Sequence, residues 1–337
     1  MLTLTPWDEH NRALVANVHP ADWTNPRPAG RYNLVVIGAG TAGLVAAAGA
    51  AGLGARVALV ERHLMGGDCL NVGCVPSKAL TRAARAWADV RRAAELGVRV
   101  PDGARVEFGA VMERMRRVRA ALSPTDSATR FRGLGVDVFL GHGRFVARDR
   151  IQVGEAVLEF SRALVATGAR PAAPAIPGLA EAGYLTSETV FELTELPRRL
   201  ALVGAGPIGC ELAQAFARFG AEVVLLDREP RVLPREDGDA AARVERALAG
   251  DGVRLVLGAA IARVERGAAG TRVLHVQADG RAEAVVVDAV LVGVGRVPNV
   301  DDLGLERAGV AFDARRGVHV DDRLRTANRR VFAAGDV

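Results

Sequence analysis

The run Leu34-Val35-Val36-Ile37-Gly38-Ala39-Gly40-Thr41-Ala42-Gly43 decides the fold of this chain. Its four apolar residues predict a short, buried strand of a parallel sheet. Gly38 permits a tight turn, Gly40 lets a pyrophosphate approach the backbone, and Gly43 lets the following helix pack closely on the strand. The amino-terminal end of that helix favours phosphate charge. The run therefore predicts a dinucleotide-binding turn between a strand and a helix.

The residues that follow complete a strand–helix–strand unit. Residues 44–51 are rich in Ala and predict the helix, and residues 56–60 predict a second strand that ends at Glu61. An acid at this position can accept a hydrogen bond from a ribose hydroxyl. Because strand, turn, helix and acid occur together, the signal is much more specific than the glycines alone.

The same pattern returns about 166 residues further on. Residues 200–203 predict a strand, Gly204-Ala205-Gly206-Pro207-Ile208-Gly209 repeats the glycine spacing, and residues 211–219 predict a helix. Residues 223–226 predict the next strand, which ends at Asp227. This internal repeat predicts two dinucleotide sites in one chain.

The residues after the second unit leave the choice of nicotinamide cofactor open. Asp227 favours the free 2′-hydroxyl of NADH over the 2′-phosphate of NADPH. Arg228 and Arg231 lie just beyond it in the sequence and could hold a phosphate. We expect NADH, with NADPH as the alternative.

A third motif, Gly66-Gly67-Asp68-Cys69-Leu70-Asn71-Val72-Gly73-Cys74-Val75-Pro76-Ser77-Lys78, carries two of the three cysteines. In a regular helix, Cα atoms five residues apart are about 8.7 Å apart, whereas a disulfide needs them within about 7 Å. If Cys69 and Cys74 bond, the segment is therefore a distorted helix start, with Gly73 able to absorb the distortion. Such a strained bridge is easily reduced.

Other interpretations of these residues stay open. The two thiols could be unpaired and buried, or could bind a metal, although no second ligand pair accompanies them. A helix amino-terminus and a nearby cation such as Lys78, the one lysine of the chain, would lower a thiol pKa. Cys210 is expected to be a small packing residue.

The remaining segments give weaker signals. Helical spacing covers 108–121, Ser123-Pro124 is typical of a helix N-cap followed by proline, and 136–166 predicts short strands. Further strands are expected at 272–276 and 285–294.

Length and composition exclude several classes of protein. A chain of 337 residues suits two domains. No run of about 18 apolar residues predicts a membrane span. Polar residues 8–10 stand where a signal peptide needs an apolar core, so we expect a cytoplasmic protein. The net charge of +5 reflects scattered arginines, and no nucleic-acid motif accompanies it. Residues 1–30 are interpreted as an extension or linker.

These motifs, in this order, make the chain from about residue 31 onward resemble the flavoprotein pyridine nucleotide-disulfide oxidoreductases, particularly their mercuric-reductase-like and dihydrolipoamide-dehydrogenase-like members. The resemblance implies an α/β fold of two nested, Rossmann-like, three-layer domains. An FAD domain would comprise residues 31–168 and 291–337, and an NAD(P)H domain residues 169–290. The family continues into an interface domain that forms a homodimer and supplies a His-Glu pair. We find no such domain in the sequence and expect a truncated protein.

The resemblance also implies roles for individual residues. Cys74 would lie against the flavin, Cys69 would exchange with substrate, and Lys78 would pair with Glu211. Asp68 stands where the family usually has Thr, and its carboxylate could raise the pKa of Cys69. The residues expected to bind FAD or NAD(P)H are Gly38, Gly40, Thr41, Ala42, Gly43, Glu61, Arg62, Gly67, Asp68, Lys78, Thr167, Gly168, Gly204, Gly206, Ile208, Gly209, Asp227, Arg228, Gly295, Arg296, Gly335 and Asp336.

Three functions of a flavin-dependent protein remain in competition, beside a fourth in which the cysteines form a metal-binding module. The first is an enzyme that passes electrons from NAD(P)H through FAD and the Cys69–Cys74 disulfide to a small disulfide-type acceptor. The second keeps this electron path but reduces Hg(II). The third is a flavin-binding module that senses redox state without turnover.

Overall fold

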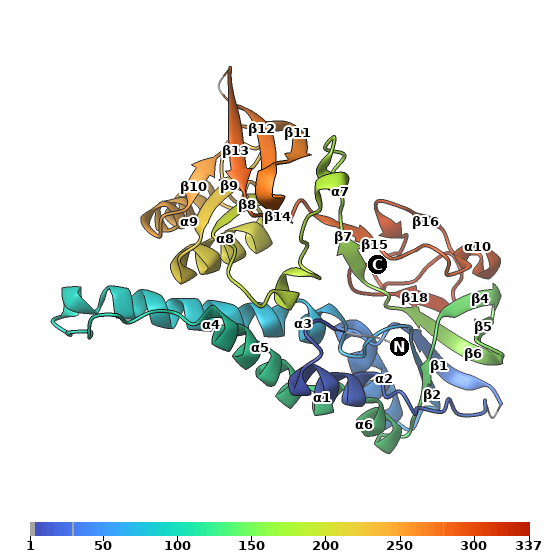
Figure 1. The fold of residues 1–337 in the computed structure, drawn as a ribbon. Helices are drawn as coiled ribbons and strands as arrows, with labels where there is room; N and C mark the ends of the chain where they lie inside the picture. Colours follow the sequence, from blue (N-terminus) through green and yellow to red (C-terminus); the bar gives the residue numbers. More distant parts are fainter. Residues whose placement is uncertain (1–3, 29, 279) are drawn as a thin grey trace. The chain divides into compact units, whose positions relative to one another are not determined.

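The computed structural model describes residues 4–28, 30–278 and 280–337. The chain forms two compact units, and each combines separate stretches of the sequence, so that the blue and the red ends of the colour bar in Figure 1 both belong to unit 1. Unit 1 comprises Met1–Val75, Arg116–Arg170 and Arg296–Val337, and unit 2 comprises Pro76–Met115 and Pro171–Gly295. Residues 76–115 thus group with the second unit. The functional domain borders expected from the sequence stay a prediction.

Unit 1 is built on a seven-stranded sheet. Its order begins β3-β2-β1-β6 with all pairs parallel, and β18 also runs parallel to the carboxyl half of β6. β4 and β5 extend it as an antiparallel meander from the amino half of β6. The strands are β1 (Tyr32–Ile37), β2 (Val57–Glu61), β3 (Val136–Leu140), β4 (Gly143–Ala147), β5 (Arg150–Val153), β6 (Ala156–Val165) and β18 (Val331–Ala333).

Alternate residues of the parallel strands face two separate cores. Val36 and Leu59 pack in a cluster with α2 (Thr41–Gly52) and α6 (Ala128–Gly133). Their neighbours Val35 and Val60 belong to the cluster that holds the β4–β6 meander and α10 (Leu305–Ala308). Because strand side chains alternate between faces, one sheet carries a layer on each side. This is the three-layer α/β arrangement that the sequence predicts.

The amino-terminal segment is more ordered than an extension or linker. It contains α1 (Glu9–Val18), which buries Leu14 and Val18 in the same core as α2. Beyond α1, the Asn25 side chain donates to Leu140 O at 3.0 Å and accepts from Leu140 N at 2.8 Å. This contact covers part of β3, the edge strand of the sheet. Apart from residues 1–3 and 29, which lie outside the described residues, the segment is a packed part of unit 1.

Unit 2 repeats the arrangement with a four-stranded parallel sheet in the order β10-β9-β8-β14. A three-stranded antiparallel sheet, β11-β12-β13, accompanies it. The strands are β8 (Arg199–Val203), β9 (Glu222–Leu226), β10 (Arg254–Val256), β11 (Ala260–Arg266), β12 (Arg272–Ala278), β13 (Arg281–Val287) and β14 (Ala289–Val292).

Helices and the antiparallel sheet enclose the parallel sheet of unit 2. α8 (Pro207–Phe219) packs on β8 and β9 and against α9 (Gly238–Gly250). Ala201 and Val203 of β8 share a core with residues of the antiparallel sheet, among them Leu274. Unit 2 also contains most of α4 (Cys74–Arg91) and the start of α5 (Phe108–Leu122), whose Phe108 ring contacts two phenylalanine rings of α8.

Two local predictions were wrong. The expected strand 285–294 is two strands, because Asp288 interrupts it and binds the backbone N–H and the guanidinium of Arg199. Ser123 is not the N-cap of an α-helix. It opens the 3-10 helix η2 (Ser123–Asp126), and the side chain of Ser127 caps α6 instead, accepting from Arg130 N at 3.1 Å.

Short elements complete the described part of the chain. These are α3 (Gly67–Asn71), α7 (Leu179–Ala182), the 3-10 helices η1 (Ala93–Leu96), η3 (Val190–Glu192) and η4 (Ala268–Gly270), and the paired strands β7 (Ala169–Pro171) with β15 (Arg296–Pro298) and β16 (Phe312–Asp313) with β17 (Gly317–Val318). Among the described residues, we find no helix with the length and apolarity needed to cross a membrane.

Candidate functional site

The glycine-rich turn of unit 1 excludes side chains at two of its glycines. Gly38 has φ +104°, and a Cβ there would lie 2.2 Å from Ala166 O. A Cβ on Gly43 would lie 1.8 Å from Gly38 O. These contacts are far inside van der Waals distance. The strand and the amino-terminal turn of α2 therefore pack as closely as the sequence predicts.

Glu61, at the end of β2, holds this turn from the inside. Its carboxylate accepts from Ala39 N and from His63 N, both at 2.7 Å. Burial raises the pKa of Glu61, against the effect of these backbone N–H groups. Arg62, the next residue, is exposed. Glu61 thus stabilises the loop, independently of any hydrogen bond that it accepts from a ribose.

Backbone contacts bring the predicted residues of unit 1 together. A Cβ on Gly67, at the start of α3, would lie 2.6 Å from the Cα of Gly40. A Cβ on Gly335, just after β18, would lie 3.6 Å from that of Ala42. The glycine-rich turn, the start of the thiol segment and the Gly335-Asp336 motif are therefore neighbours, although they lie far apart in the sequence.

Arg296 links these pieces electrostatically. Its guanidinium forms an ion pair with Asp68 and donates to Ala169 O, and its Nε lies 3.5 Å from a carboxylate oxygen of Asp336. Arg296 is only about a quarter exposed, so screening by water is limited. Asp68, the departure from the family pattern, therefore has a cationic partner.

Thr167 and Gly168 lie at the carboxyl end of β6, and Asn299 fixes them. The Thr167 hydroxyl donates to Asn299 O at 2.7 Å, and the Asn299 amide donates back to Thr167 O at 2.9 Å. Gly168 has φ +65°, and its carbonyl accepts from Asn299 N. The edge of the sheet where β1, β6 and β18 end thus carries the predicted residues. Parallel sheets bind ligands at this edge.

Residues on this edge fit a dinucleotide. Glycines line the first turn where a side chain would displace the backbone, and the helix that starts at Thr41 directs its free N–H groups to the same place. Arg296 lies at the same edge, where its charge is shared with Asp68 and Asp336. The residues that would hold FAD here are those of the glycine-rich turn, Glu61, Thr167, Arg296 and Asp336.

The thiol segment breaks its helix between the two cysteines. α3 ends at Asn71 and α4 begins at Cys74. A Cβ on Gly73 would lie 2.8 Å from Asp68 O, so this tight passage needs glycine. The side chains of Cys69 and Cys74 are hydrogen-bonded to each other. The helix is therefore interrupted where the disulfide geometry requires it.

The expectation of a lowered thiol pKa does not hold for Cys69. Burial, the hydrogen bond with Cys74 and the negative charge of Asp126 raise the pKa of Cys69 to about 11. Asp68 is not among the causes, because its carboxylate is paired with Arg296. Sequence reasoning missed Asp126, whose own pKa burial raises. It comes from η2, and nothing local in the sequence connects that turn with the cysteines.

The second glycine-rich turn has the same geometry in unit 2. Gly204 has φ +110°, and a Cβ there would lie 2.4 Å from Gly293 O. A Cβ on Gly209 would lie 1.8 Å from Gly204 O. A Cβ on Gly206 would meet no described atom within 4 Å, and Ile208 is partly exposed. This turn therefore leaves an open approach to the backbone.

Asp227 holds this turn as Glu61 holds the first one. Its carboxylate accepts from Ala205 N at 2.5 Å and from Glu229 N at 2.9 Å. Arg231 points back to the chain, donating to the carbonyls of Pro234 and Glu236. The Arg228 side chain is exposed. Gly295, at the other end of unit 2, has φ +124°, and its carbonyl accepts from Ala172 N.

The solitary lysine pairs as the resemblance implies. Lys78 Nζ lies 2.5 Å from Glu211 Oε1, and both residues belong to unit 2. The lysine side chain is about two-thirds exposed, so the pair contributes little to stability. Cys210, beside Glu211, is buried and donates its S–H to Ala205 O. It is a packing residue, as predicted.

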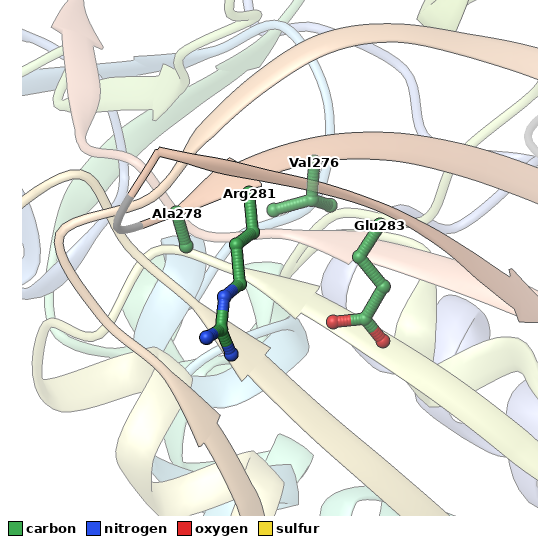
Figure 2. A pocket seen from close by; sticks show the side chains of 4 residues that line it. All are labelled: Val276, Ala278, Arg281 and Glu283. Atoms are coloured by element: carbon green, nitrogen blue, oxygen red, sulfur yellow. The ribbon is translucent and has the colours of Figure 1, made fainter.

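A pocket of about 410 Å³ lies on the antiparallel sheet of unit 2 (Figure 2). Val276, Ala278, Arg281 and Glu283 line it, and Glu283 accepts from Arg254 at 2.6 Å. No residue predicted to bind a nucleotide lines this pocket, so we assign it no role in the reaction. Within the described ranges, no cluster of three or more His, Cys, Asp or Glu residues could hold a metal ion.

The fold and the site define a class of α/β protein with two dinucleotide-type units and a paired-thiol segment beside the first. The chain belongs to the pyridine nucleotide-disulphide oxidoreductase family, whose sequence pattern matches residues 32–337. This family uses FAD and NAD(P)H, the cofactors that the sequence predicts.

Curated relatives and a solved structure support this assignment. The chain is 36% identical to a mercuric reductase of Lysinibacillus sphaericus and 38% identical to dihydrolipoyl dehydrogenase 3 of Pseudomonas aeruginosa, over 91% of its length in each case. These matches cover 56% and 67% of the two relatives. The Cu(II) complex of the HOCl-induced flavoprotein disulfide reductase RclA from Escherichia coli matches with a TM-score of 0.78 and 31% identity, covering 91% of this chain and 66% of that one. The chain thus spans about half to two-thirds of the length of these proteins.

Proposed function

We propose that this chain provides the two nucleotide-binding units and the redox thiols of an FAD-dependent NAD(P)H oxidoreductase that acts on a disulfide-type acceptor. The observation that carries the proposal is the contact between Gly67 and Gly40, which places the start of the thiol segment against the predicted FAD turn. When bound, FAD would accept a hydride from the nicotinamide and pass two electrons to sulfur.

The residues of this chain would divide the remaining work. Cys69, as a thiolate, attacks one sulfur of the acceptor and releases the first thiol. Cys74 then attacks Cys69, releases the second thiol and restores the Cys69–Cys74 disulfide. Overall, NAD(P)H, one proton and one acceptor disulfide give NAD(P)⁺ and two thiols. We propose that the Lys78–Glu211 pair helps to orient the nicotinamide, and the ion pair between the two side chains supports this role.

The nicotinamide cofactor is proposed to be NADH. Arg231 donates two hydrogen bonds to backbone carbonyls, and Asp227 has its carboxylate where the sequence predicts the ribose. A 2′-phosphate would meet that negative charge. Comparing NADH with NADPH as reductant of the same sample tests this choice.

The experiment that tests the proposal counts thiols. Flavin-loaded protein, treated with NADH in the absence of oxygen, should gain two titratable thiols per chain. Cys69→Ser and Cys74→Ser should gain none, and Cys210→Ser should behave as the wild type. A wild-type sample that oxidises NADH without gaining thiols would refute the electron path.

Reduction of Hg(II) is the second candidate, because a relative with 36% identity is named a mercuric reductase. In that reaction NAD(P)H and Hg²⁺ give NAD(P)⁺, H⁺ and Hg⁰. Mercury-dependent NAD(P)H oxidation by the complete protein separates the two acceptors. A single reduction without turnover would indicate the sensor instead. We also propose that the complete protein is a homodimer, as the family resemblance implies.

A further inference from the structure

The amino-terminal helix lies against the loop that leads into the thiol segment. Val18 O, at the end of α1, accepts from Met65 N at 3.2 Å, and the His19 ring is hydrogen-bonded to His63 O. The side chains of Val18 and Met65 are fully buried in the same cluster. The end of α1 therefore fixes the residues just before α3 with both backbone and side-chain contacts.

A second tie reaches the other end of α3. Arg119, on α5, donates from Nη2 to Asn11 Oδ1 and from Nη1 to Asn71 O, each at 2.6 Å. Asn11 is fully buried and Arg119 is 4% exposed. A buried guanidinium is stable only if its N–H groups are paired, so Asn11 of α1 helps to keep Arg119 on Asn71.

Asn71 is the residue at which the helix stops. Its carbonyl lies at the carboxyl end of α3, where no intrahelical N–H is available, and Arg119 satisfies it. Its side-chain amide donates to Met65 O at 3.1 Å and to Gly67 O at 2.9 Å. Asn71 thus closes the segment from Met65 onward into a tied loop. The break that follows determines how closely Cys69 approaches Cys74.

We infer that α1 is a positioning element for the thiol pair. Through Asn11 and Arg119 at one end of α3, and through Val18 and His19 at the other, it holds Cys69 where Cys74 can reach it. This inference rests on the proposed function in treating the two thiols as a redox couple. It assigns a role to an amino-terminal segment that lies outside the family match at residues 32–337.

The test measures the equilibrium in which the protein dithiol and one oxidised glutathione give the protein disulfide and two reduced glutathiones. Asn11→Ala removes the side-chain oxygen that accepts from Arg119. Asn11→Asp keeps a side-chain oxygen that can accept this hydrogen bond. Asn17→Ala is the matched control, because Asn17 is also on α1 but donates to Ser123 instead. Hydrogen exchange of residues 67–74 and the melting temperature are measured on each variant. Asn11→Ser replaces Asn11→Ala if the latter does not fold.

Asn11→Ala should shift the equilibrium toward the dithiol about tenfold, or about 30 mV, and speed exchange in residues 67–74. Asn11→Asp and Asn17→Ala should stay within about twofold of the wild type. If Asn11→Ala lowers the melting temperature but changes neither the thiol equilibrium nor the exchange of residues 67–74, α1 only stabilises the fold and the inference is overturned. If the wild type forms no disulfide at all, the proposed function fails. Hydrogen exchange then decides alone whether α1 positions α3: faster exchange in Asn11→Ala supports it and unchanged exchange refutes it.

Discussion

The two glycine-rich turns differ in their surroundings more than in their own geometry. In each, a Cβ on the third glycine would lie 1.8 Å from the carbonyl of the first, and an acid at the end of the next strand binds the loop. The middle glycines differ. Gly40 has the backbone of Gly67 beside it, whereas a Cβ on Gly206 would meet no described atom within 4 Å. One turn has the backbone of the thiol segment against its middle glycine, and the other has free space at its middle glycine.

This difference matches the two kinds of cofactor that the family uses. A nucleotide that stays bound suits a turn enclosed by neighbouring segments, because a preorganised enclosure lowers the entropy that binding must overcome. A nucleotide that enters and leaves at each turnover suits an open turn. We therefore expect FAD at the first turn and the nicotinamide cofactor at the second.

The largest effects should come from closing either turn with a methyl group. Gly43→Ala and Gly209→Ala each place a Cβ 1.8 Å from a carbonyl oxygen, so strand and helix must separate. Gly43→Ala should reduce FAD retention more than a hundredfold and leave NADH binding intact, and Gly209→Ala should do the reverse. Flavin absorbance measures FAD retention, and fluorescence titration measures NADH binding. Gly49→Ala, in an exposed part of α2 with no atom within 4 Å, is the control. A loss of both cofactors in one variant would contradict the separation of the sites.

The surroundings of the two middle glycines, Gly67 beside Gly40 and the free space at Gly206, sharpen the contrast between the two turns. Gly67→Ala would place a Cβ 2.6 Å from Gly40 Cα at φ +55°, and should destabilise unit 1 by about 2 kcal/mol. Gly206→Ala has free space and should leave the melting temperature within about 1 °C while weakening NADH binding about tenfold. Thermal unfolding of the two variants measures the difference in stability, and NADH titration measures the difference in affinity. Equal melting temperatures would mean that the first turn is not enclosed.

A smaller effect should separate the half-buried thiol of Cys69 from the buried thiol of Cys210. Burial is the main cause that raises the pKa of both Cys69 and Cys210 to about 11, and each also has a carboxylate nearby, Asp126 and Asp227 respectively. Asp126→Asn removes negative charge beside Cys69 alone, so it should lower the Cys69 pKa and speed its alkylation about threefold at pH 9. Alkylation of Cys210 should not change. Mass spectrometry of the two cysteine peptides measures both rates. An unchanged Cys69 rate would exclude Asp126 as a partner.

The smallest effect should be a dependence of the stability of unit 1 on pH in the acidic range. Burial opposes the charge of Asp8, but the Asn11 N–H and the Arg116 guanidinium outweigh it and hold the pKa of Asp8 below its usual value. A carboxyl whose pKa is lowered by folding stabilises the folded state above its unfolded pKa, near 3.8, and this stability is lost as the pH falls through the folded pKa. Below about pH 4, α1 should therefore loosen in the wild type. Asp8→Asn should be less stable at pH 7 and show a smaller further loss on acidification. Hydrogen exchange of α1 checks both.

Local patterns in the sequence predicted the elements that build the two turns. Alternating apolar residues and fixed glycine spacing act over a few residues, so β1, α2, β8 and α8 follow from them directly. The pairing of Lys78 with Glu211 came only from the family resemblance. Contacts between distant segments could not be read from local pattern. Asp126 and Arg119 are ordinary charged residues in sequence, and only the packing of η2 and α5 brings them to the thiol segment.

The helix α1 illustrates why the rest was missed. Its buried apolar residues are few, and polar residues surround them in the sequence. Asn11 reads as a solvated residue until its partners are known, because a buried amide is stable only when it is fully bonded. The predicted strand 285–294 failed for a related reason. The apolar run continues on both sides of Asp288, and only the bonds with Arg199 explain the break.

The environment of Cys69 determines how readily the reduced protein reacts with compounds other than its acceptor. Because burial, the hydrogen bond with Cys74 and the charge of Asp126 raise the pKa of Cys69, its thiol is largely protonated near neutral pH. Stray electrophiles and peroxides react with thiolates, so they would find little to attack. An acceptor that arrives together with a base would release this latent nucleophile. The Cys69 thiol is therefore unreactive while it is protonated, and it becomes reactive only when its acceptor is present.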